Sequence, residues 1–395
     1  MSNQRVVFYC NAIDETIRAA RGITTDSPAA TRKVLGVARA LQAAGCNVMV
    51  ASMGRGRVKG RLDFHPASTR SESGIVVRYG PTVSMPGVSE VLSVGWLLWT
   101  AIRASLARET VHLFYNQFIA YLPALAWLRL LRARTVTDIE DGQIDRETQA
   151  TLPTRGNASP PLFARFVSGG ALLACRKLAS STTIRPVLPC YGALNLAPAP
   201  NRSANLPLVV MLSGLLSEGT GSDLLLAALR HLVESRDNRL RRLSIEVAGF
   251  GPGLTVLSRA AADPALQLTV HGRLNASAYS ALLDRAAVGL SLKTHSSAYA
   301  DTTFPSKVME YAERAQCLIA TDISDVRHVF GETARYLTSD DPKLLAAELA
   351  WAADNPTEVL RRGREARLLV EGRFTEAAVG RELRDFLFPS LNKTQ

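Results

Sequence analysis

The feature that most constrains the fold of this sequence is a regular alternation of short apolar runs with segments of helical periodicity. Runs at 6–10 and 47–52 are rich in β-branched and aromatic residues and predict strands, and 29–43 carries an apolar stripe of helical spacing between them. Strands that alternate with helices favour a parallel sheet covered by helices on both faces. The chain therefore predicts a doubly wound α/β fold.

The same alternation continues through the first half of the chain. Residues 54–72 are rich in Gly, Arg and Ser and predict an excursion or hairpin before the next strand. Further strands are predicted at 74–79, 111–115, 135–139 and 182–188, and helices at 89–108, 121–133 and 162–179. The loop at 22–28 lacks the GxGxxG pattern of dinucleotide sites, which disfavours nicotinamide binding.

A second alternating series begins at residue 206. Its predicted strands lie at 207–212, 244–248, 266–271, 288–292 and 317–321, and its predicted helices at 223–233, 255–262, 277–286, 343–353 and 356–371. A last helix is predicted at 375–387. The chain thus predicts two Rossmann-like domains, which would face each other across a cleft.

The stretch between the two series, 195–205, combines prolines with small polar residues and predicts a linker. We expect an N-terminal domain over 1–196 and a C-terminal domain over 206–372. The remaining residues, 373–395, would form a C-terminal helix that crosses back to the N-terminal domain.

Charge narrows the choice of partners. The formal net charge is +11, dispersed over scattered arginines, which favours acidic partners such as nucleotides, sugar phosphates or anionic lipids. Aromatic residues make up only 6% of the chain, and the sequence lacks a basic stripe with interleaved aromatics. Nucleic acid is therefore not an expected partner.

Cysteine usage and apolar content indicate the compartment. The five cysteines are scattered and show no CxxC or metal-ligand spacing, so we expect reduced core residues and no bound metal. The N-terminus lacks the order of regions of a signal peptide, and no apolar stretch is long enough to span a bilayer. These features predict a cytoplasmic protein, with the inner face of the membrane as an alternative location.

Two segments suggest contact with a membrane surface as an alternative. Residues 91–101 and 121–134 combine tryptophans and leucines with nearby arginines, as helices at a membrane interface do. Helices that cover a parallel sheet have a similar composition. Packing against the core is the favoured interpretation, and a peripheral contact with an anionic membrane is the alternative.

Residues 301–313 predict a loop that leads into a helix with polar groups near its start. Thr303 is a candidate N-cap, and Pro305 suits the first turn, where its missing N–H is not needed. One helix face is expected to point inward and the other outward. The inward residues are Val308, Met309, Ala312 and Ala315, and the outward residues are Lys307, Glu310, Tyr311 and Arg314.

Two of the outward residues have a chemical interpretation. Lys307 lies in the first turn, where unpaired N–H groups and the helix dipole favour an anion, so its ammonium would strengthen a phosphate site. Glu310 lies about one turn further on and could accept hydrogen bonds from a sugar diol. The alternative is an exposed Lys–Glu pair of little energetic weight.

Other candidate residues lie in loops that follow predicted strands. The glycine-bearing loop 213–222 precedes a helix that Ser222 or Asp223 would cap, which predicts a second anion site. Asn11, Asn116 and an acidic cluster lie at the ends of strands of the first domain, where ligands bind in such sheets. The acidic residues could bind the acceptor or cap the next element, and capping is preferred. The acidic residues are Asp138, Glu140 and Asp141. His112 and His271 are expected to be hydrogen-bonded structural residues.

An ordered set of motifs in the second half resembles the two-domain, GT-B-type retaining glycosyltransferases of the large family-four group (glycosyl transferases group 1). The resemblance rests on the segments 209–215, 218–229, 247–252, 270–273 and 304–312, and on 34–50 in the first half. The Phe-Pro-Ser-Lys form of the last motif is similar to the subgroup that builds bacterial surface polysaccharides.

The resemblance assigns roles to residues at matching positions. Glu310 falls on the family's glutamate that holds the ribose of the nucleotide, and Thr302 falls where the family has an acid that contacts the donor sugar. Leu215 and Thr220 replace the family's diphosphate-binding Arg and Lys. The resemblance therefore implies Lys307, Arg273 and Thr302 as catalytic residues. It also implies donor-binding roles for Thr303, Phe304, Pro305, Ser306, Gly214, Gly219 and Gly221. The candidate residues for the acceptor, in the first domain, are Thr24, Asn116, Asp138, Glu140 and Asp141.

The implied activity is a hexosyl transfer. The resemblance implies a nucleotide-diphosphate sugar bound by the C-terminal domain, and a glycan or lipid-linked acceptor bound by the N-terminal domain. It implies retention of configuration, with the leaving phosphate accepting the acceptor's proton, and no metal or permanently bound cofactor. Two alternatives remain: a non-catalytic protein that binds nucleotide or glycan, and a nucleotide-sugar epimerase of similar architecture.

Overall fold

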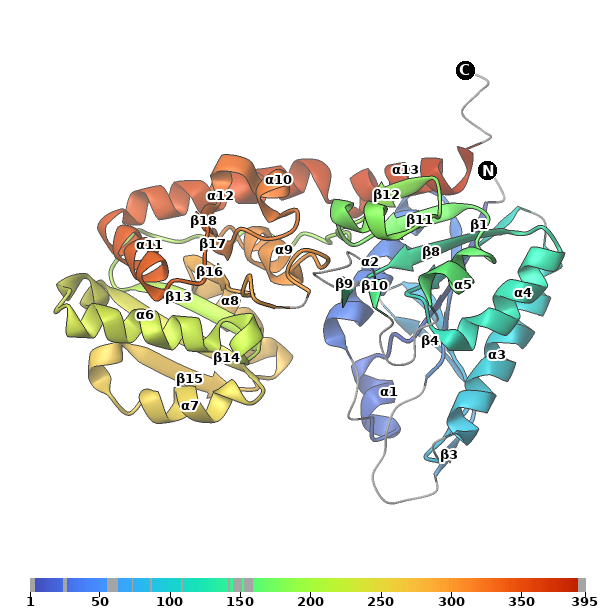
Figure 1. Ribbon diagram of the computed structural model, residues 1–395, viewed down its shortest axis with the longest axis horizontal. Helices are drawn as coiled ribbons and strands as arrows, with labels where there is room; N and C mark the ends of the chain where they lie inside the picture. The colour runs from blue at the N-terminus through green and yellow to red at the C-terminus, as the bar shows by residue number, and fades with distance from the viewer. Residues whose placement is uncertain are drawn as a thin grey trace. The chain divides into compact units, whose positions relative to one another are not determined.

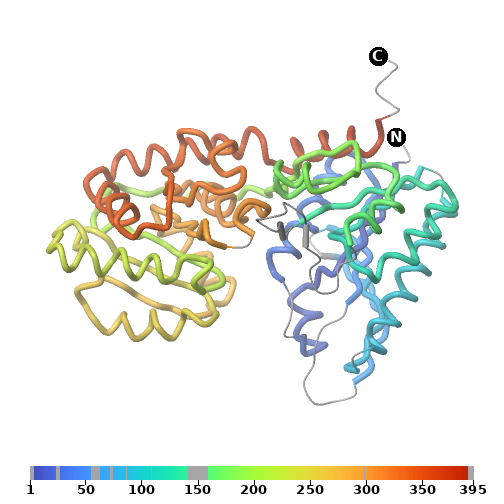
Figure 2. Tube along the Cα trace, in the orientation of Figure 1, coloured from blue at the N-terminus to red at the C-terminus, as the bar shows by residue number. Residues whose placement is uncertain are grey.

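The structure, a computed structural model, describes residues 4–23, 27–54, 63–72, 74–85, 87–107, 109–140, 143–144, 151–152, 159–297 and 299–389. The chain divides into two compact α/β units (Figure 1). The first unit comprises Met1–Asn195 and Phe374–Gln395, and the second comprises Leu196–Arg373. The last helix, α13 (Glu376–Leu387), therefore belongs to the same unit as the first strand, β1 (Arg5–Cys10) (Figure 2).

The sheet of the first unit has eight strands in the order β12-β11-β8-β7-β1-β2-β5-β4. All neighbours pair in parallel except β4 and β5, which form an antiparallel hairpin; an excursion or hairpin was predicted for 54–72 and a strand for 74–79. Besides β1, the strands are β2 (Asn47–Ser52), β4 (Ser68–Glu72), β5 (Ile75–Tyr79), β7 (Thr110–Tyr115), β8 (Arg134–Ile139), β11 (Gly170–Leu173) and β12 (Val187–Pro189).

Helices cover this sheet. Helices α3 (Val88–Ser105) and α4 (Leu122–Leu130) pack on the face that carries Tyr9 and Phe114, whose rings stack with centroids 4.5 Å apart. Helix α2 (Pro28–Ala43) packs against α13 in the same unit. The contact of these two helices is close, because a Cβ at Gly380 would lie 2.0 Å from the carbonyl oxygen of Ala40.

The remaining elements of the first unit are short. They are α1 (Glu15–Ala20), α5 (Pro160–Ala164), β3 (Phe64–His65) paired with β6 (Thr82–Val83), β9 (Gln143–Ile144) paired with β10 (Thr151–Leu152), and the 3₁₀ turns η1 (Ile119–Tyr121) and η2 (Arg176–Ser181). All five cysteines are buried thiols, as expected. Among the described residues, no helix combines the length and apolar character needed to cross a bilayer.

The single helix predicted at 162–179 is wrong. The segment contains α5, then strand β11, then η2. The helix cannot pass Gly170, whose φ of +122° lies outside the helical region. A Cβ at Gly170 would also lie 2.6 Å from the carbonyl oxygen of Pro186, so glycine is what allows β11 to join the sheet.

The sheet of the second unit has six parallel strands in the order β15-β14-β13-β16-β17-β18. These are β13 (Leu208–Leu215), β14 (Leu243–Phe250), β15 (Leu268–Gly272), β16 (Val288–Ser291), β17 (Cys317–Thr321) and β18 (Arg335–Leu337). Sequence analysis predicts all of them except β18.

Seven helices accompany this sheet in the described residues. They are α6 (Ser222–Glu234), α7 (Gly253–Ala260), α8 (Ala276–Arg285), α9 (Ser306–Glu313), α10 (Val326–Phe330), α11 (Pro342–Asp354) and α12 (Pro356–Arg373), with 3₁₀ turns η3 (Glu218–Thr220), η4 (Asn238–Arg242), η5 (Pro264–Leu266) and η6 (Gly331–Thr333). The core joins the leucines of α6 and α11 to the apolar residues of β13 and β14. The fold is thus α/β and doubly wound in both units, as predicted.

His112 has the structural role expected from the sequence. Its Nδ1 lies 2.9 Å from the hydroxyl oxygen of Tyr9, and the ring is buried. Burial lowers the pKa of His112 from 6.5 to about 4. The imidazole is therefore neutral in the folded protein at neutral pH.

This low pKa predicts a loss of stability in acid. The folded-state pKa lies below the unfolded value, so the contribution of His112 is complete above about pH 6.5 and is lost as the pH falls toward 4. We expect the unfolding free energy, measured by urea titration, to fall less over this range in His112→Gln than in the unmodified protein. The same substitution at the exposed His328 serves as the control, and equal pH dependence in both variants would contradict the prediction.

Candidate functional site

The candidate site lies where the strand order of the second sheet reverses. The chain runs from β13 outward through β14 to β15, then returns to the other side of β13 to form β16 and β17. In sheets of this kind, the connections that leave β13 and β16 separate to opposite faces, which opens a crevice at the carboxyl ends of the strands. The residues predicted from the sequence come from the segments that follow these two strands.

Helix α9 supplies the predicted cation and carboxylate. It begins at Ser306, with Pro305 as the N-cap residue in an extended conformation (φ −69°, ψ 105°). The predicted N-cap at Thr303 is therefore wrong, and Pro305 precedes the first turn instead of lying in it. The later start follows from the extended backbone at Pro305, which a helical residue cannot have. Lys307 still lies in the first turn, as predicted.

The inward face of α9 is as predicted, since Val308, Met309, Ala312 and Ala315 are buried. Tyr311 was expected to point outward and is instead fully buried. Gly289 in β16 makes room for it, because a Cβ there would lie 2.3 Å from Cγ of Tyr311. The Tyr311 hydroxyl accepts a hydrogen bond from the backbone N–H of Ser213 at 3.1 Å and lies 3.0 Å from Oγ of Ser213.

Lys307, Glu310 and Tyr279 form one hydrogen-bonded cluster. The Lys307 ammonium donates to Oε2 of Glu310 at 2.5 Å and to the hydroxyl oxygen of Tyr279 at 2.6 Å. The Tyr279 hydroxyl donates to the same Oε2 at 3.0 Å. Lys307 and Glu310 lie three residues apart on α9, whereas Tyr279 comes from α8. The exposed pair of the alternative interpretation is not observed, because both side chains are largely buried.

Burial and the charge of Glu310 determine the protonation state of Tyr279. Burial, together with the nearby Glu310 carboxylate, raises the pKa of the Tyr279 phenol well above its ordinary value. The phenol therefore stays protonated at neutral pH and donates a hydrogen bond to the Glu310 carboxylate. Its oxygen also lies 2.9 Å from Oγ of Ser213 at the end of β13, which ties the cluster to the strand.

A glycine lies directly beneath the cluster. Gly214 has a φ of +121°, and a Cβ there would lie 3.4 Å from Cε of Lys307. A Cβ at the neighbouring Gly249 would lie 2.0 Å from the carbonyl oxygen of Gly214. Gly249 thus lets β14 approach β13 closely, and Gly214 lies next to the Lys307 stem.

The predicted cap of α6 is wrong. The N-cap is Gly221, in a left-handed conformation with φ of +81°, and neither Ser222 nor Asp223 takes that position. A Cβ at Gly221 would lie 2.3 Å from Cβ of Leu292, so the loop is pressed against the end of β16 and a capping side chain has no space. Gly219 lies in the turn η3, where its carbonyl accepts the backbone N–H of Thr294 at 3.2 Å.

The other predicted donor-binding residues surround the start of α9. Thr302 and Thr303 are buried, and the backbone N–H of Thr302 donates to the carbonyl of Tyr299 at 3.3 Å. Phe304 is partly buried, and Ser306 is exposed as the first residue of the helix. These residues form the loop between β16 and α9, on the same side of the sheet as Lys307.

Leu215 and Thr220 stand where the resembled family has an Arg and a Lys, and both make contacts unrelated to charge. Leu215 is an exposed residue at the end of β13, and the Thr220 hydroxyl donates to its carbonyl oxygen at 2.5 Å. The guanidinium of Arg273 lies over the ring of Phe250, 5.4 Å from its centroid. Phe250, the last residue of β14, and Arg273, which follows β15, therefore form an exposed cation–π pair.

In the first unit, the predicted acidic cluster pairs with a lysine from α2. The Lys33 ammonium donates to Oδ1 of Asp138 at 3.0 Å and to Oε1 of Glu140. Burial disfavours the Lys33 charge, but these carboxylates outweigh it and raise its pKa. Asp138 lies within β8, so the predicted capping role is wrong. Its Oδ2 is buried and has no hydrogen-bond partner among the described residues.

Asn116 occupies the end of the neighbouring strand. Its φ is +63°, its backbone N–H donates to the carbonyl of Asp138 at 2.7 Å, and its side chain accepts the N–H of Gln117. Thr24 and Asp141, the other predicted acceptor residues, lie outside the described residues. Within the described part of the chain, no group of three His, Cys, Asp or Glu side chains is arranged to hold a metal ion.

Sequence reasoning missed Tyr279 and Lys33. Both lie on helices far in sequence from their partners, and each looks like an ordinary polar residue of an amphipathic helix. One sequence feature could have pointed to Tyr279: it is an aromatic residue in the first turn of α8, the helix that follows strand β15. That feature predicts a contact with Lys307 and Glu310 only when the position of α8 beside α9 is known.

Several solved structures share this fold, and one of them is named a glycosyltransferase. TarM of S. aureus matches with a TM-score of 0.68 and 8% identity, over 98% of this chain and 99% of that chain. HepE of Anabaena, solved with UDP and glucose, matches with a TM-score of 0.66 and 10% identity, over 97% and 99%. A Rickettsia africae glycosyltransferase matches with a TM-score of 0.65 and 13% identity, over 100% of both chains.

No protein-family model and no curated protein sequence matches the chain. The similarity to the solved structures extends over nearly the whole chain at low sequence identity, so it establishes the fold. The chain has the GT-B fold predicted from its sequence.

Proposed function

We propose that this protein is a retaining glycosyltransferase that moves a hexose from a nucleotide-diphosphate sugar to a glycan or lipid-linked acceptor, in the synthesis of a bacterial surface polysaccharide. The observation that carries the proposal is the Lys307–Glu310–Tyr279 cluster beside Gly214. It places a cation and a carboxylate together at the switch point of a Rossmann-like sheet, where nucleotides bind in such folds.

Each group of the cluster suits one part of the donor. The Glu310 carboxylate can accept two hydrogen bonds from the ribose diol, and the Lys307 ammonium can neutralise charge that develops on the leaving diphosphate. The N-terminal amides of α9 and the loop at Gly214 and Gly219 add N–H donors for the same phosphates. Arg273 is the second cation proposed for this task, and Thr302 is proposed to contact the donor sugar.

The proposed mechanism needs little covalent chemistry from the protein. The leaving phosphate takes the proton of the acceptor hydroxyl as the new glycosidic bond forms on the same face of the sugar. The protein contributes positive charge at the phosphate and holds the donor away from water. Lys33, Asp138, Glu140 and Asn116, at the carboxyl ends of the first sheet, are proposed to contact the acceptor.

The proposal draws support from the solved structures. HepE is described in complex with UDP and glucose, and an S. aureus TarM variant in complex with UDP and a GlcNAc-glycerol. A second candidate is a protein that binds nucleotide or glycan without turnover. Leu215, Thr220 and Thr302 favour it, because they stand where the resembled family carries two cations and an acid.

Nucleotide binding followed by donor turnover separates the two candidates. We expect UDP or GDP to bind in titration calorimetry, and the matching nucleotide sugar to be hydrolysed slowly in the absence of acceptor. Binding without hydrolysis or transfer across a broad set of acceptors would favour the non-catalytic candidate. Interconversion of the donor sugar without an acceptor would indicate an epimerase.

The cluster also predicts a modest effect of Tyr279→Phe. This substitution removes the hydrogen bond from the Tyr279 hydroxyl to the Glu310 carboxylate and one acceptor for Lys307. Because Tyr279 acts on the nucleotide only through these two residues, nucleotide binding should weaken by about 0.5–1.5 kcal/mol. Tyr336→Phe is the matched control, because it removes a tyrosine hydroxyl bonded to the carbonyl of Gly331 near α10. Equal nucleotide affinities in the two variants, measured by calorimetry, would show that Tyr279 does not position the cluster.

A further inference from the structure

Helix α3 of the first unit has an exposed face of apolar residues and glycine, with the exposed Arg103 at its edge. Every third or fourth residue along the helix and its C-cap belongs to this face. Val91 is 71% exposed and Leu106 is 81% exposed, and the side chains between them are also open to solvent. The exposed face consists of Val88, Val91, Gly95, Trp99, Ile102 and Leu106.

The buried face of α3 is made mostly of small and hydroxyl-bearing residues, and Leu97 is its one large apolar side chain. Its buried members are Ser89, Ser93, Leu97, Thr100, Ala101 and Ala104. The hydroxyls are satisfied locally: Ser93 donates to the carbonyl of Ser89, and Thr100 to that of Trp96, each at 2.8 Å. Leu97, Val94 and Trp96 pack against the core, but the other face of the helix also carries large apolar residues, which is unusual for a surface helix. Core packing, the favoured prediction for 91–101, is confirmed for the inner face, where Leu97 and Ala101 lie in the core.

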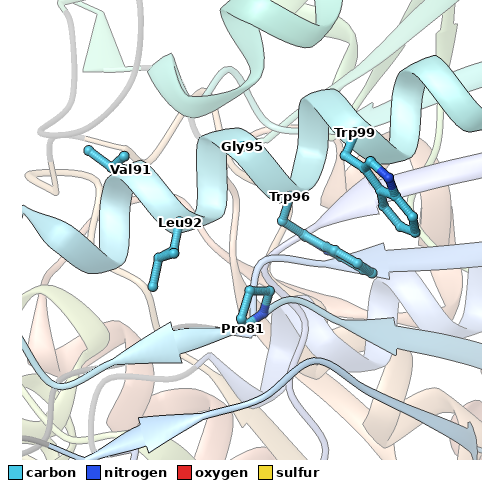
Figure 3. Close-up of a pocket in the computed structure, with 6 residues that line it drawn as sticks. All are labelled: Pro81, Val91, Leu92, Gly95, Trp96 and Trp99. Carbon is cyan, nitrogen blue, oxygen red and sulfur yellow. The ribbon is translucent and has the colours of Figure 1, made fainter.

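A cavity opens beside this face. It has a volume of about 500 Å³ and is lined by Pro81, Val91, Leu92, Gly95, Trp96 and Trp99. Leu92 and Trp96 point from α3 toward Pro81 (Figure 3). The indole rings of Trp96 and Trp99 stack with centroids 5.2 Å apart. Trp96 lies against the backbone at Gly80, where a Cβ would lie 2.6 Å from its ring.

Cations accompany the apolar surface. The guanidinium of Arg103 lies over the ring of Trp99, 5.4 Å from its centroid. Helix α4, which packs against α3, ends in the exposed residues Leu130 and Leu131, flanked by the exposed Arg129 and Arg132. The acid in α3 is Glu90, whose carboxylate accepts the backbone N–H of Gly87 at the helix start.

Tryptophan, leucine and valine next to arginine match a lipid interface, where apolar side chains enter the acyl region and guanidinium groups reach anionic headgroups. A second copy of the chain fits less well, since two surfaces that carry Arg103, Arg129 and Arg132 would bring charges of the same sign together. The net charge of +11 also favours an anionic surface.

We propose that the exposed face of α3 and the end of α4 form a docking surface for an anionic lipid bilayer. The protein lies on the bilayer and does not enter it deeply. Val91, Trp99 and Leu106 insert among the lipids, and Arg103, Arg129 and Arg132 contact the headgroups. This surface is separate from the Lys307–Glu310–Tyr279 cluster, so the proposal does not depend on the proposed transferase activity.

Vesicle binding tests the proposal with the full chain. We expect the protein to co-sediment with vesicles of equal parts phosphatidylglycerol and phosphatidylcholine, and its tryptophan emission to shift to shorter wavelength. Brominated acyl chains should quench that emission, because Trp99 enters the acyl region. The paired substitution Val91→Ser with Leu106→Ser should weaken binding about 10- to 100-fold.

Leu368→Ser is the matched control, since Leu368 is an exposed leucine on α12 of the second unit. It should leave vesicle binding unchanged, and all variants should keep the thermal midpoint of the unmodified protein. No vesicle binding, or binding that the paired substitution leaves intact, would overturn the proposal. A dimer in light scattering that the paired substitution dissociates would also overturn it, in favour of a second copy on this face.

Discussion

Replacing Lys307 with alanine is expected to lower the rate of sugar transfer by about 10²- to 10³-fold, the range for removing one preorganised group that stabilises developing charge. The effect should be large because the resembled family's other two cations are absent at Leu215 and Thr220. Lys307 would then carry most of the charge that meets the leaving diphosphate. The measurement is the initial rate of nucleoside diphosphate release from the donor that the unmodified protein turns over.

Two further variants serve as controls for the Lys307→Ala result. Lys343→Ala removes an exposed lysine at the start of α11 and should leave the rate unchanged. Lys307→Arg keeps the positive charge and should retain more activity than Lys307→Ala. Full activity in Lys307→Ala would exclude a role for this ammonium at the reacting phosphate.

Glu310→Ala is expected to weaken nucleotide binding by about 1–3 kcal/mol, or about 5- to 150-fold, because a charged acceptor for the ribose hydroxyls is lost. Part of the effect will be offset, since Lys307 loses its ion pair with Glu310 and becomes more available to the phosphates. Binding of the bare nucleoside should therefore fall more than binding of the diphosphate. Titration calorimetry with uridine and UDP measures both.

Glu234→Ala provides the control for this second prediction, because Glu234 is an exposed glutamate at the end of α6. Its nucleotide affinity should equal that of the unmodified protein. A folded Glu310→Ala variant with unchanged affinity for both ligands would remove Glu310 from the nucleotide site.

Most of the second sheet could be predicted from the sequence because its longer strands contain short, largely buried apolar runs between helices of clear periodicity. Residues 317–321, for example, are predicted as a strand with the bounds that β17 has. Strand β18 was not predicted, because Arg335–Leu337 is only three residues long and lacks an apolar run. Its pairing with β17 depends on the tertiary structure.

The errors have local causes. The prediction for 162–179 treated an apolar run as one helix, although Gly170 adopts a backbone conformation that only glycine takes readily. Tyr311 was placed on the outer face of α9 from its helical position alone. The missing Cβ of Gly289, on a different strand, is what lets the phenol reach Ser213.

The candidate site could be predicted only in part. The spacing of Lys307 and Glu310 on one helix was enough to bring them together, since residues three apart share a helix face. Tyr279 could not be predicted, because its contact with both residues depends on how α8 packs beside α9. The same holds for Lys33, which meets Asp138 across more than a hundred positions of sequence.

The central claim is tested most directly by following nucleotide sugars and acceptors with the protein by NMR, which reports both turnover and the configuration at the anomeric carbon. We predict a transferred or hydrolysed sugar whose first product has the donor's configuration, with loss of the signal in Lys307→Ala. A product of inverted configuration would contradict the retaining mechanism. Nucleotide binding without transfer or hydrolysis of any donor would contradict the proposal that the protein is an enzyme.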